Sequence, residues 1–88
     1  MNLNEYQKAI KIDLERKLLF QSIEQKNNII YFPTEEGNII CIEKEKEIRL
    51  NELRELSQLI PHCILGIISQ DSSIVYYSIE SITLQFKK

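Results

Sequence analysis

The sequence has 88 residues, enough for one domain with a modest hydrophobic core. Hydrophobic residues make up 43% and charged residues 27%, with two Gly and two Pro, a composition that excludes a disordered linker. Eleven Lys and Arg oppose thirteen Asp and Glu, so the basic excess typical of an autonomous nucleic-acid-binding domain is missing. Residues 1–88 are therefore expected to form a single domain, and an autonomous role in binding DNA or RNA is disfavoured.

The N-terminal third predicts one long helix from about Asn4 to Gln25. Asn4 or Asn2 can cap its start, and Lys26-Asn27-Asn28 is a reasonable stop. The apolar residues that recur at near-helical spacing are Tyr6, Ile10, Leu14 and Leu18.

A β-hairpin is expected next. Its strands are Asn28–Phe32 and Asn38–Ile42, and the segment Thr34–Asn38 supplies the turn. The alternating charges of Glu43–Glu47 are typical of a solvated connection.

The second half predicts a shorter helix followed by strands. Asn51 is expected to cap a helix that ends near Leu59, before Pro61. The apolar segment Cys63–Ile68 suits a strand buried on both faces. Another strand is expected over Ser73–Glu80, and residues 81–86 either continue it or add a short last strand. The sum is an α+β domain, with one long N-terminal helix and a short helix packed on a small, mainly antiparallel or mixed sheet.

The two cysteines, Cys41 and Cys63, lie inside apolar stretches. Reduced core thiols of an intracellular protein are the favoured interpretation, with a disulfide or a metal site as the alternatives. A Cys/Cys/His zinc site would lack its fourth ligand, so no metal and no cofactor are expected.

Groups suited to catalysis are sparse. His62 is the only histidine, and its place between Pro61 and a buried strand fits a structural residue. The neighbouring acids Glu35 and Glu36 have no apolar surroundings that would raise a pKa. No phosphate-binding Gly-rich loop exists, so the sequence predicts a protein that is not an enzyme.

The C-terminal strand is the best candidate for a binding surface. Alternation places Ile74, Tyr76 and Ser78 on one face and Val75, Tyr77 and Ile79 on the other. Both faces carry large side chains, and no Pro or inward charge protects the strand edge. Two interpretations remain open, an interior strand of the chain's own sheet and a strand that pairs with a partner.

The segment from Cys63 to Tyr77 resembles the C-terminal signature of the smallest, structural subunit of the eukaryotic tRNA-splicing endonuclease. Its pattern is an apolar strand, the turn Ser69-Gln70-Asp71-Ser72-Ser73, and then Ile74-Val75-Tyr76-Tyr77. The upstream segment from Ile48 to Pro61 resembles the short helix that precedes this strand in the family. The resemblance covers most of the chain, and its specific part runs from about Leu50 to Ile79.

The resemblance implies the small helix-flanked sheet of the tRNA-intron endonuclease C-terminal domain. It also implies a non-catalytic scaffold subunit in a nuclear heterotetramer, with catalytic and other structural subunits as partners. Subunits of this family pair through their C-terminal strands, and a loop inserts into a neighbour. The residues that match are Ile74, Val75, Tyr76, Tyr77 and Ile79 for the strand and Asp71 for the loop. The isolated chain is expected to form a homodimer, to contact pre-tRNA indirectly at most, and not to insert into a membrane.

The Tyr/His/Lys set of the catalytic relatives cannot be carried over to this sequence, because His62 lies outside the matching loop. Two alternatives accompany the leading hypothesis. One is a generic α+β adaptor that binds peptides by strand pairing. The other is a small RNA-cleaving enzyme that would depend on His62.

Overall fold

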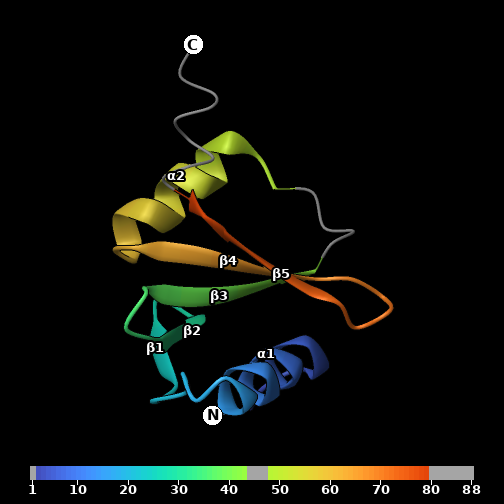
Figure 1. Cartoon of the computed structure of the whole chain (residues 1–88). Helices are drawn as coiled ribbons and strands as arrows, with labels where there is room; N and C mark the ends of the chain where they lie inside the picture. The colour runs from blue at the N-terminus through green and yellow to red at the C-terminus, as the bar shows by residue number, and fades with distance from the viewer. Residues whose placement is uncertain (1, 44–47, 80–88) are drawn as a thin grey trace.

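The computed structural model describes residues 2–43 and 48–79, which form two helices and a five-stranded mixed sheet. The predicted α+β class is confirmed. In chain order the elements are α1 (Glu5–Arg16), β1 (Glu24–Lys26), β2 (Ile29–Pro33), β3 (Asn38–Glu43), α2 (Leu50–Leu59), β4 (Cys63–Ile68) and β5 (Ile74–Ser78) (Figure 1).

The strands lie in chain order across the sheet, from β1 to β5. Neighbouring strands are antiparallel except β3 and β4, which are parallel. A parallel pair needs a long crossover connection, and α2 lies within that connection. The β3–β4 ladder runs from the pair Asn38 and Cys63 to the pair Glu43 and Ile68, which makes these two strands the centre of the sheet.

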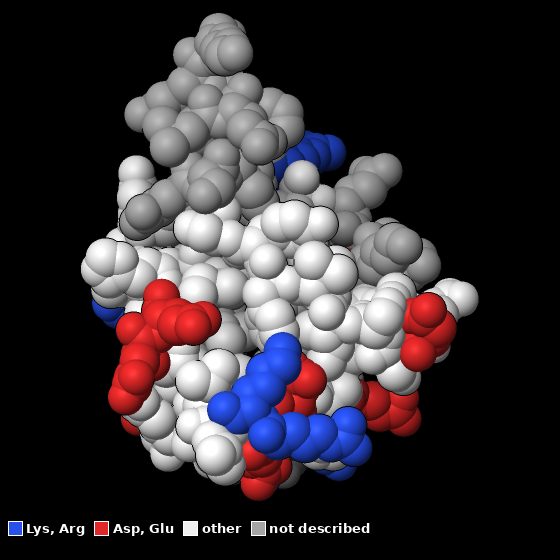
Figure 2. Space-filling model, viewed as in Figure 1, with Lys and Arg blue, Asp and Glu red and all other residues white. Residues whose placement is uncertain are grey.

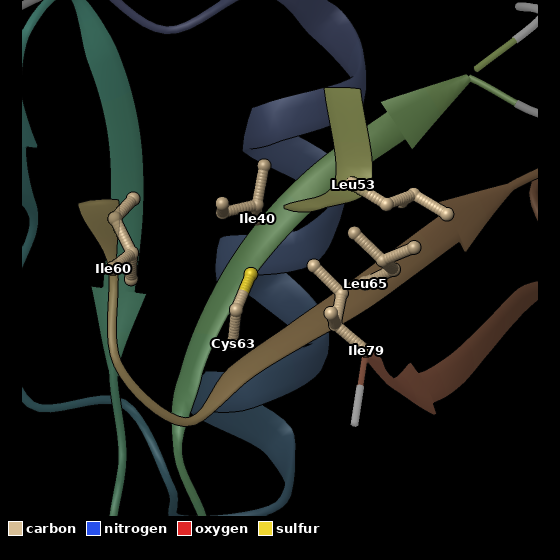
Figure 3. Close-up of a cluster of buried hydrophobic side chains, with 6 residues drawn as sticks. All are labelled: Ile40, Leu53, Ile60, Cys63, Leu65 and Ile79. Atoms are coloured by element: carbon tan, nitrogen blue, oxygen red, sulfur yellow. The ribbon is translucent and has the colours of Figure 1, made fainter. Parts of the chain in front are cut away.

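The two helices cover opposite faces of the sheet (Figure 1). Successive side chains of a strand point to opposite faces, so the neighbours Ile39 and Ile40 are both buried but belong to different clusters. The cluster beneath α1 contains Ile10, Leu14, Phe32 and Ile39. The cluster beneath α2 contains Ile40, Leu53, Ile60, Cys63, Leu65 and Ile79 (Figure 3).

Helix α1 is shorter than predicted. Its start is a capping box, in which the Asn4 side chain accepts from the Gln7 amide at 2.7 Å and the Gln7 side chain accepts from the Asn4 amide at 2.9 Å. The helix ends at Arg16, because Leu18 adopts a left-handed conformation with φ of 59°. The prediction of a helix reaching Gln25 is therefore wrong.

The segment after α1 contains a strand that the sequence did not predict. Glu24–Lys26 pairs with Ile29–Tyr31, and Asn27 and Asn28 join the two strands with φ values of 48° and 66°. Two consecutive left-handed residues characterise the tightest β-hairpin turn, and Asn tolerates this conformation well. The residues predicted to stop a helix therefore form a hairpin turn.

The later elements lie close to their predicted places. Helix α2 begins at Leu50, and the cap position is Arg49, which makes no side-chain capping hydrogen bond. Asn51 is therefore inside the first turn, and its predicted role as the cap is wrong. Strand β4 occupies the predicted Cys63–Ile68, with buried residues on both faces, and β5 is shorter than predicted. The charged residues 44–47 and the predicted continuation over residues 81–86 lie outside the described residues.

Neither of the helices described, within residues 2–43 and 48–79, has the length and apolar character needed to cross a lipid bilayer.

Gly37 holds the β2–β3 turn against the start of β4. Its φ is 151°, and an added Cβ would lie 2.5 Å from the carbonyl oxygen of His62 and 2.9 Å from Cδ1 of Ile64. Because the first of these neighbours is backbone, the clash cannot be relieved by moving a side chain alone.

We predict that Gly37→Ala lowers the free energy of unfolding by about 1–3 kcal/mol, through the clash and the unfavourable φ. Urea unfolding followed by circular dichroism measures the change. The matched control is Glu36→Ala, an exposed neighbour in the same turn, which should stay within about 0.5 kcal/mol of the wild type. Equal unfolding midpoints for the two variants would contradict the prediction.

Candidate partner-binding site

The turn between β4 and β5 is organised by Asp71. Its Oδ1 accepts hydrogen bonds from the Ser69 hydroxyl at 2.7 Å, the Ser73 hydroxyl at 2.7 Å and the Ser73 amide at 3.0 Å. Ser72 completes the turn with φ of 69°. The hydrogen bonds from Ser69 and Ser73 lower the pKa of the Asp71 carboxyl to about 2. Asp71 is exposed, so this carboxylate both shapes the turn and presents a negative charge to solvent.

Strand β5 has two unlike faces. Ile74 and Tyr76 point toward α1 and pack against the cluster beneath it. Val75 and Tyr77 point to the opposite face, where they are 46% and 50% exposed. Their cross-strand partners are Ile67 and Leu65 of β4, which pack in the cluster beneath α2. Val75 and Tyr77 therefore extend the apolar surface of the cluster beneath α2 toward solvent.

Ile79 follows β5 and is 1% exposed, as part of the cluster beneath α2 (Figure 3). Of the predicted partner-binding residues, Asp71, Val75 and Tyr77 are thus exposed, whereas Ile74, Tyr76 and Ile79 pack within the chain. The packed residues set the position of the strand, and the exposed ones are available for contact.

A polar contact attaches α1 to β5. The Tyr76 hydroxyl donates to Asp13 Oδ2 at 2.5 Å, and the Lys17 ammonium lies 3.0 Å from the same oxygen. The ammonium also lies 4.8 Å from the centroid of the Tyr76 ring, within the range of a cation–π contact. The three side chains form one network between the first helix and the outer strand.

This network changes the pKa values of its members. Burial on its own would raise the pKa of Asp13, but the hydrogen bonds from Tyr76 and Lys17 outweigh it and lower the pKa below 3.8. Burial and the bond to Asp13 both raise the pKa of Tyr76 above its usual value. At neutral pH the tyrosine is therefore a neutral donor to an ionised carboxylate, which is a strong type of hydrogen bond.

Strand β5 is the last in the strand order of the described sheet. All five of its residues, Ile74–Ser78, are uncharged. On the face shown in Figure 2, an uncharged region crosses the middle of the molecule where β5 runs in Figure 1, with most charged side chains around it. An outer strand with an apolar, half-exposed face can accept another strand through its backbone.

The remaining candidate residues have structural surroundings. The His62 carbonyl accepts from the Asn38 amide at 2.9 Å, and the residue adopts a left-handed φ of 50° in the turn before β4. Cys41 is a half-buried and Cys63 a buried free thiol, and burial raises the pKa of each to about 11. Thiols with such values are poor nucleophiles at neutral pH.

Within residues 2–43 and 48–79, no three His, Cys, Asp or Glu side chains gather in a way that could hold a metal ion.

Sequence reasoning missed Asp13 and Lys17 as supports of the binding strand. Their spacing of four residues is a common helical ion pair, so nothing local pointed to Tyr76, which lies 63 residues away from Asp13. It also missed Gly66, where an added Cβ would lie 2.8 Å from Cδ1 of Ile10 and 3.2 Å from Cε1 of Tyr76. The absent side chain lets α1 and Tyr76 pack closely over β4.

Comparison of the chain with protein-family models and with curated proteins finds no match.

We predict that Tyr76→Phe lowers the free energy of unfolding at pH 7 by about 0.5–1.5 kcal/mol, because Asp13 loses its neutral donor. Since the folded-state pKa of Asp13 is lowered, its stabilisation is present above pH 3.8 and is lost as the pH falls through the lower folded value. The difference between variant and wild type should therefore shrink below pH 3.8.

Urea unfolding at a series of pH values measures this difference. The matched control is Tyr77→Phe on the exposed face of the same strand, which should change the free energy of unfolding by less than about 0.5 kcal/mol. A Tyr76→Phe effect that keeps the same size at every pH at which the protein is folded would show that Asp13 is not responsible.

Proposed function

We propose that this chain is a non-catalytic structural subunit of a tRNA-splicing endonuclease complex. In this proposal it associates with a catalytic subunit through β5 and supports the excision of introns from pre-tRNA in the nucleus. The observation that carries the proposal is the outer strand β5, which exposes Val75 and Tyr77 on one face while α1 covers the other.

The arrangement of the C-terminal half supports the same proposal. The family resemblance expects a short helix, a buried strand, an acidic turn and a partner-facing strand in this order. Those elements are α2, β4, the turn around Asp71 and β5. The sequence pattern Asp71-Ser72-Ser73 followed by Ile74–Tyr77 lies on the turn and the outer strand, the two features that contact neighbouring subunits in this family.

Physical considerations favour strand pairing as the mode of association. A partner strand beside β5 would supply backbone hydrogen bonds along Ile74–Ser78. The same partner would cover Val75 and Tyr77, and a large aromatic side chain contributes strongly to binding when water is excluded around it. Ile74 and Tyr76 are already packed against α1, so β5 would not have to become ordered during binding.

Asp71 has a second role in this proposal. Its exposed carboxylate lies on the turn that leads into β5, and the low pKa of about 2 keeps it ionised at all physiological pH values. A basic pocket on a neighbouring subunit would complement this charge. The serine hydroxyls that hold Asp71 Oδ1 also hold the turn in one conformation before binding.

The second candidate function is a generic adaptor that pairs with any exposed strand. The uncharged character of β5 favours it, because backbone pairing has little sequence specificity. The two proposals share a binding surface and differ in the identity of the partner.

We predict that the isolated chain forms a homodimer through β5 and that Tyr77→Glu weakens the dimer at least about tenfold, because it places a charge at the centre of the interface. Sedimentation velocity over a range of concentrations measures the dissociation constant. Ile12→Glu is the matched control, since Ile12 is 49% exposed on α1 and Tyr77 is 50% exposed on β5. An equal effect of both substitutions, or none of Tyr77→Glu, would contradict association through β5.

Partner identity is tested by co-expressing the chain with the catalytic endonuclease subunit of the same cell, followed by size-exclusion chromatography. Elution together, abolished by Tyr77→Glu but not by Ile12→Glu, is the expected result. Separate elution at micromolar concentrations would exclude the endonuclease subunit as partner and favour the adaptor. Cleavage of pre-tRNA by the purified chain alone, lost in His62→Ala, would instead indicate an enzyme.

A further inference from the structure

Strands β2 and β3 separate soon after their turn. The two strands pair only at Pro33 with Asn38 and at Phe32 with Ile39. Beyond Ile39, the edge of β3 that faces β2 has no ladder partner over residues 40–42 in the described part of the chain. The ribbon of β3 runs away from that of β2 in Figure 3, in agreement with this register. In the described part of the chain, β2 and β3 are therefore not paired along residues 40–42 of β3, although β3 is a central strand of the sheet.

A groove of about 410 Å³ lies at this opening and continues beneath α2. We call it the β2–α2 groove. Its apolar lining is half-buried apart from the buried Ile40, so these side chains are partly in contact with water. The apolar residues that define it are Ile29, Ile30, Ile40, Ile42, Leu56 and Leu59.

Among the described residues that line the β2–α2 groove, the charged side chains are all acidic. Glu52 and Glu55 line its α2 side, and both are exposed. No Lys or Arg is among the described residues that line it. The two carboxylates are three residues apart on one helix, so they lie on the same side of α2 and repel each other when both are ionised. A cationic group between them would remove that repulsion.

We propose that the β2–α2 groove binds an extended segment of a partner protein, in which apolar residues are flanked by Lys or Arg. The unpaired edge of β3 supplies backbone groups for an added strand. The groove takes the apolar side chains, and Glu52 and Glu55 receive the flanking cations. This site is separate from β5, which lies at the far end of the strand order, and it does not rest on the proposed endonuclease function.

The test uses a fluorescent peptide, Lys-Lys-Ile-Val-Ile-Lys-Lys, and a control peptide with Glu at every Lys position. Fluorescence anisotropy measures the affinity, and amide chemical shifts of the isotope-labelled chain locate the site. The expected result is that only the Lys peptide binds and that it shifts the amides of Ile40–Ile42 and Leu56. Equal binding of both peptides, or shifts centred on β5, would overturn the proposal.

The double variant Glu52→Gln with Glu55→Gln should weaken binding of the Lys peptide roughly three- to tenfold, as expected for two exposed ion pairs. The control is Glu35→Gln with Glu36→Gln, which changes the net charge equally at the β2–β3 turn and should leave the affinity unchanged. Equal weakening in both double variants would show that peptide binding depends only on the net charge of the chain, and this would overturn the proposal. Concentration-dependent shifts of the same amides without peptide would assign the groove to a second copy of the chain and overturn it as well.

Discussion

The parallel pairing of β3 with β4 is the constraint on which the rest of the structure depends. Both strands are largely apolar, so the pair is stable only when both of its faces are covered. A parallel connection must leave the sheet and return, and α2 lies in that connection and covers one face. The other face is left for α1, and Gly66 lets this helix approach closely. The three layers therefore follow from one pair of strands. Strand β5 pairs with β4 and is the last strand of the sheet that the described residues form.

In this arrangement the two faces of β5 differ, because one is covered by α1 and the other is half-exposed. Helix α1 crosses the sheet far enough to reach β5, where Asp13 holds the Tyr76 hydroxyl, whereas Val75 and Tyr77 extend beyond the buried cluster beneath α2. One strand thus combines a fixed inner face with an apolar outer face. Such an arrangement suits recognition, because the chain has already ordered the strand that a partner would pair with.

The sequence predicted the elements that depend on local pattern and missed those that depend on distant contacts. Strand β4 is a continuous apolar run, and β5 is a run of β-branched and aromatic residues that follows a turn, so both were found. The end of α1 was misplaced because Leu18 continues the apolar spacing of Ile10 and Leu14, although the backbone leaves the helix at Leu18. Asn27 and Asn28 are as typical of the end of a helix as of a hairpin turn. Only the pairing of β1 with β2 decides between these two structures. Within the site, the two-residue period of a strand predicted which side chains of β5 share a face. The sequence could not predict which face is covered, because that depends on where α1 packs.

The contact between Asp13 and Tyr76 also has a consequence for how the chain is made. The two residues are 63 positions apart, so the face beneath α1 cannot be completed until β5 has left the ribosome. Of the described elements, α1 is the first in chain order and β5 the last, so the apolar side of α1 is fully buried only after the other described elements have been synthesised. Contacts of such long sequence separation slow folding, because a large loop has to close before they form. Complete burial of the apolar side of α1 therefore depends on β5, and a truncation within β5 would leave that side of the helix partly exposed to water.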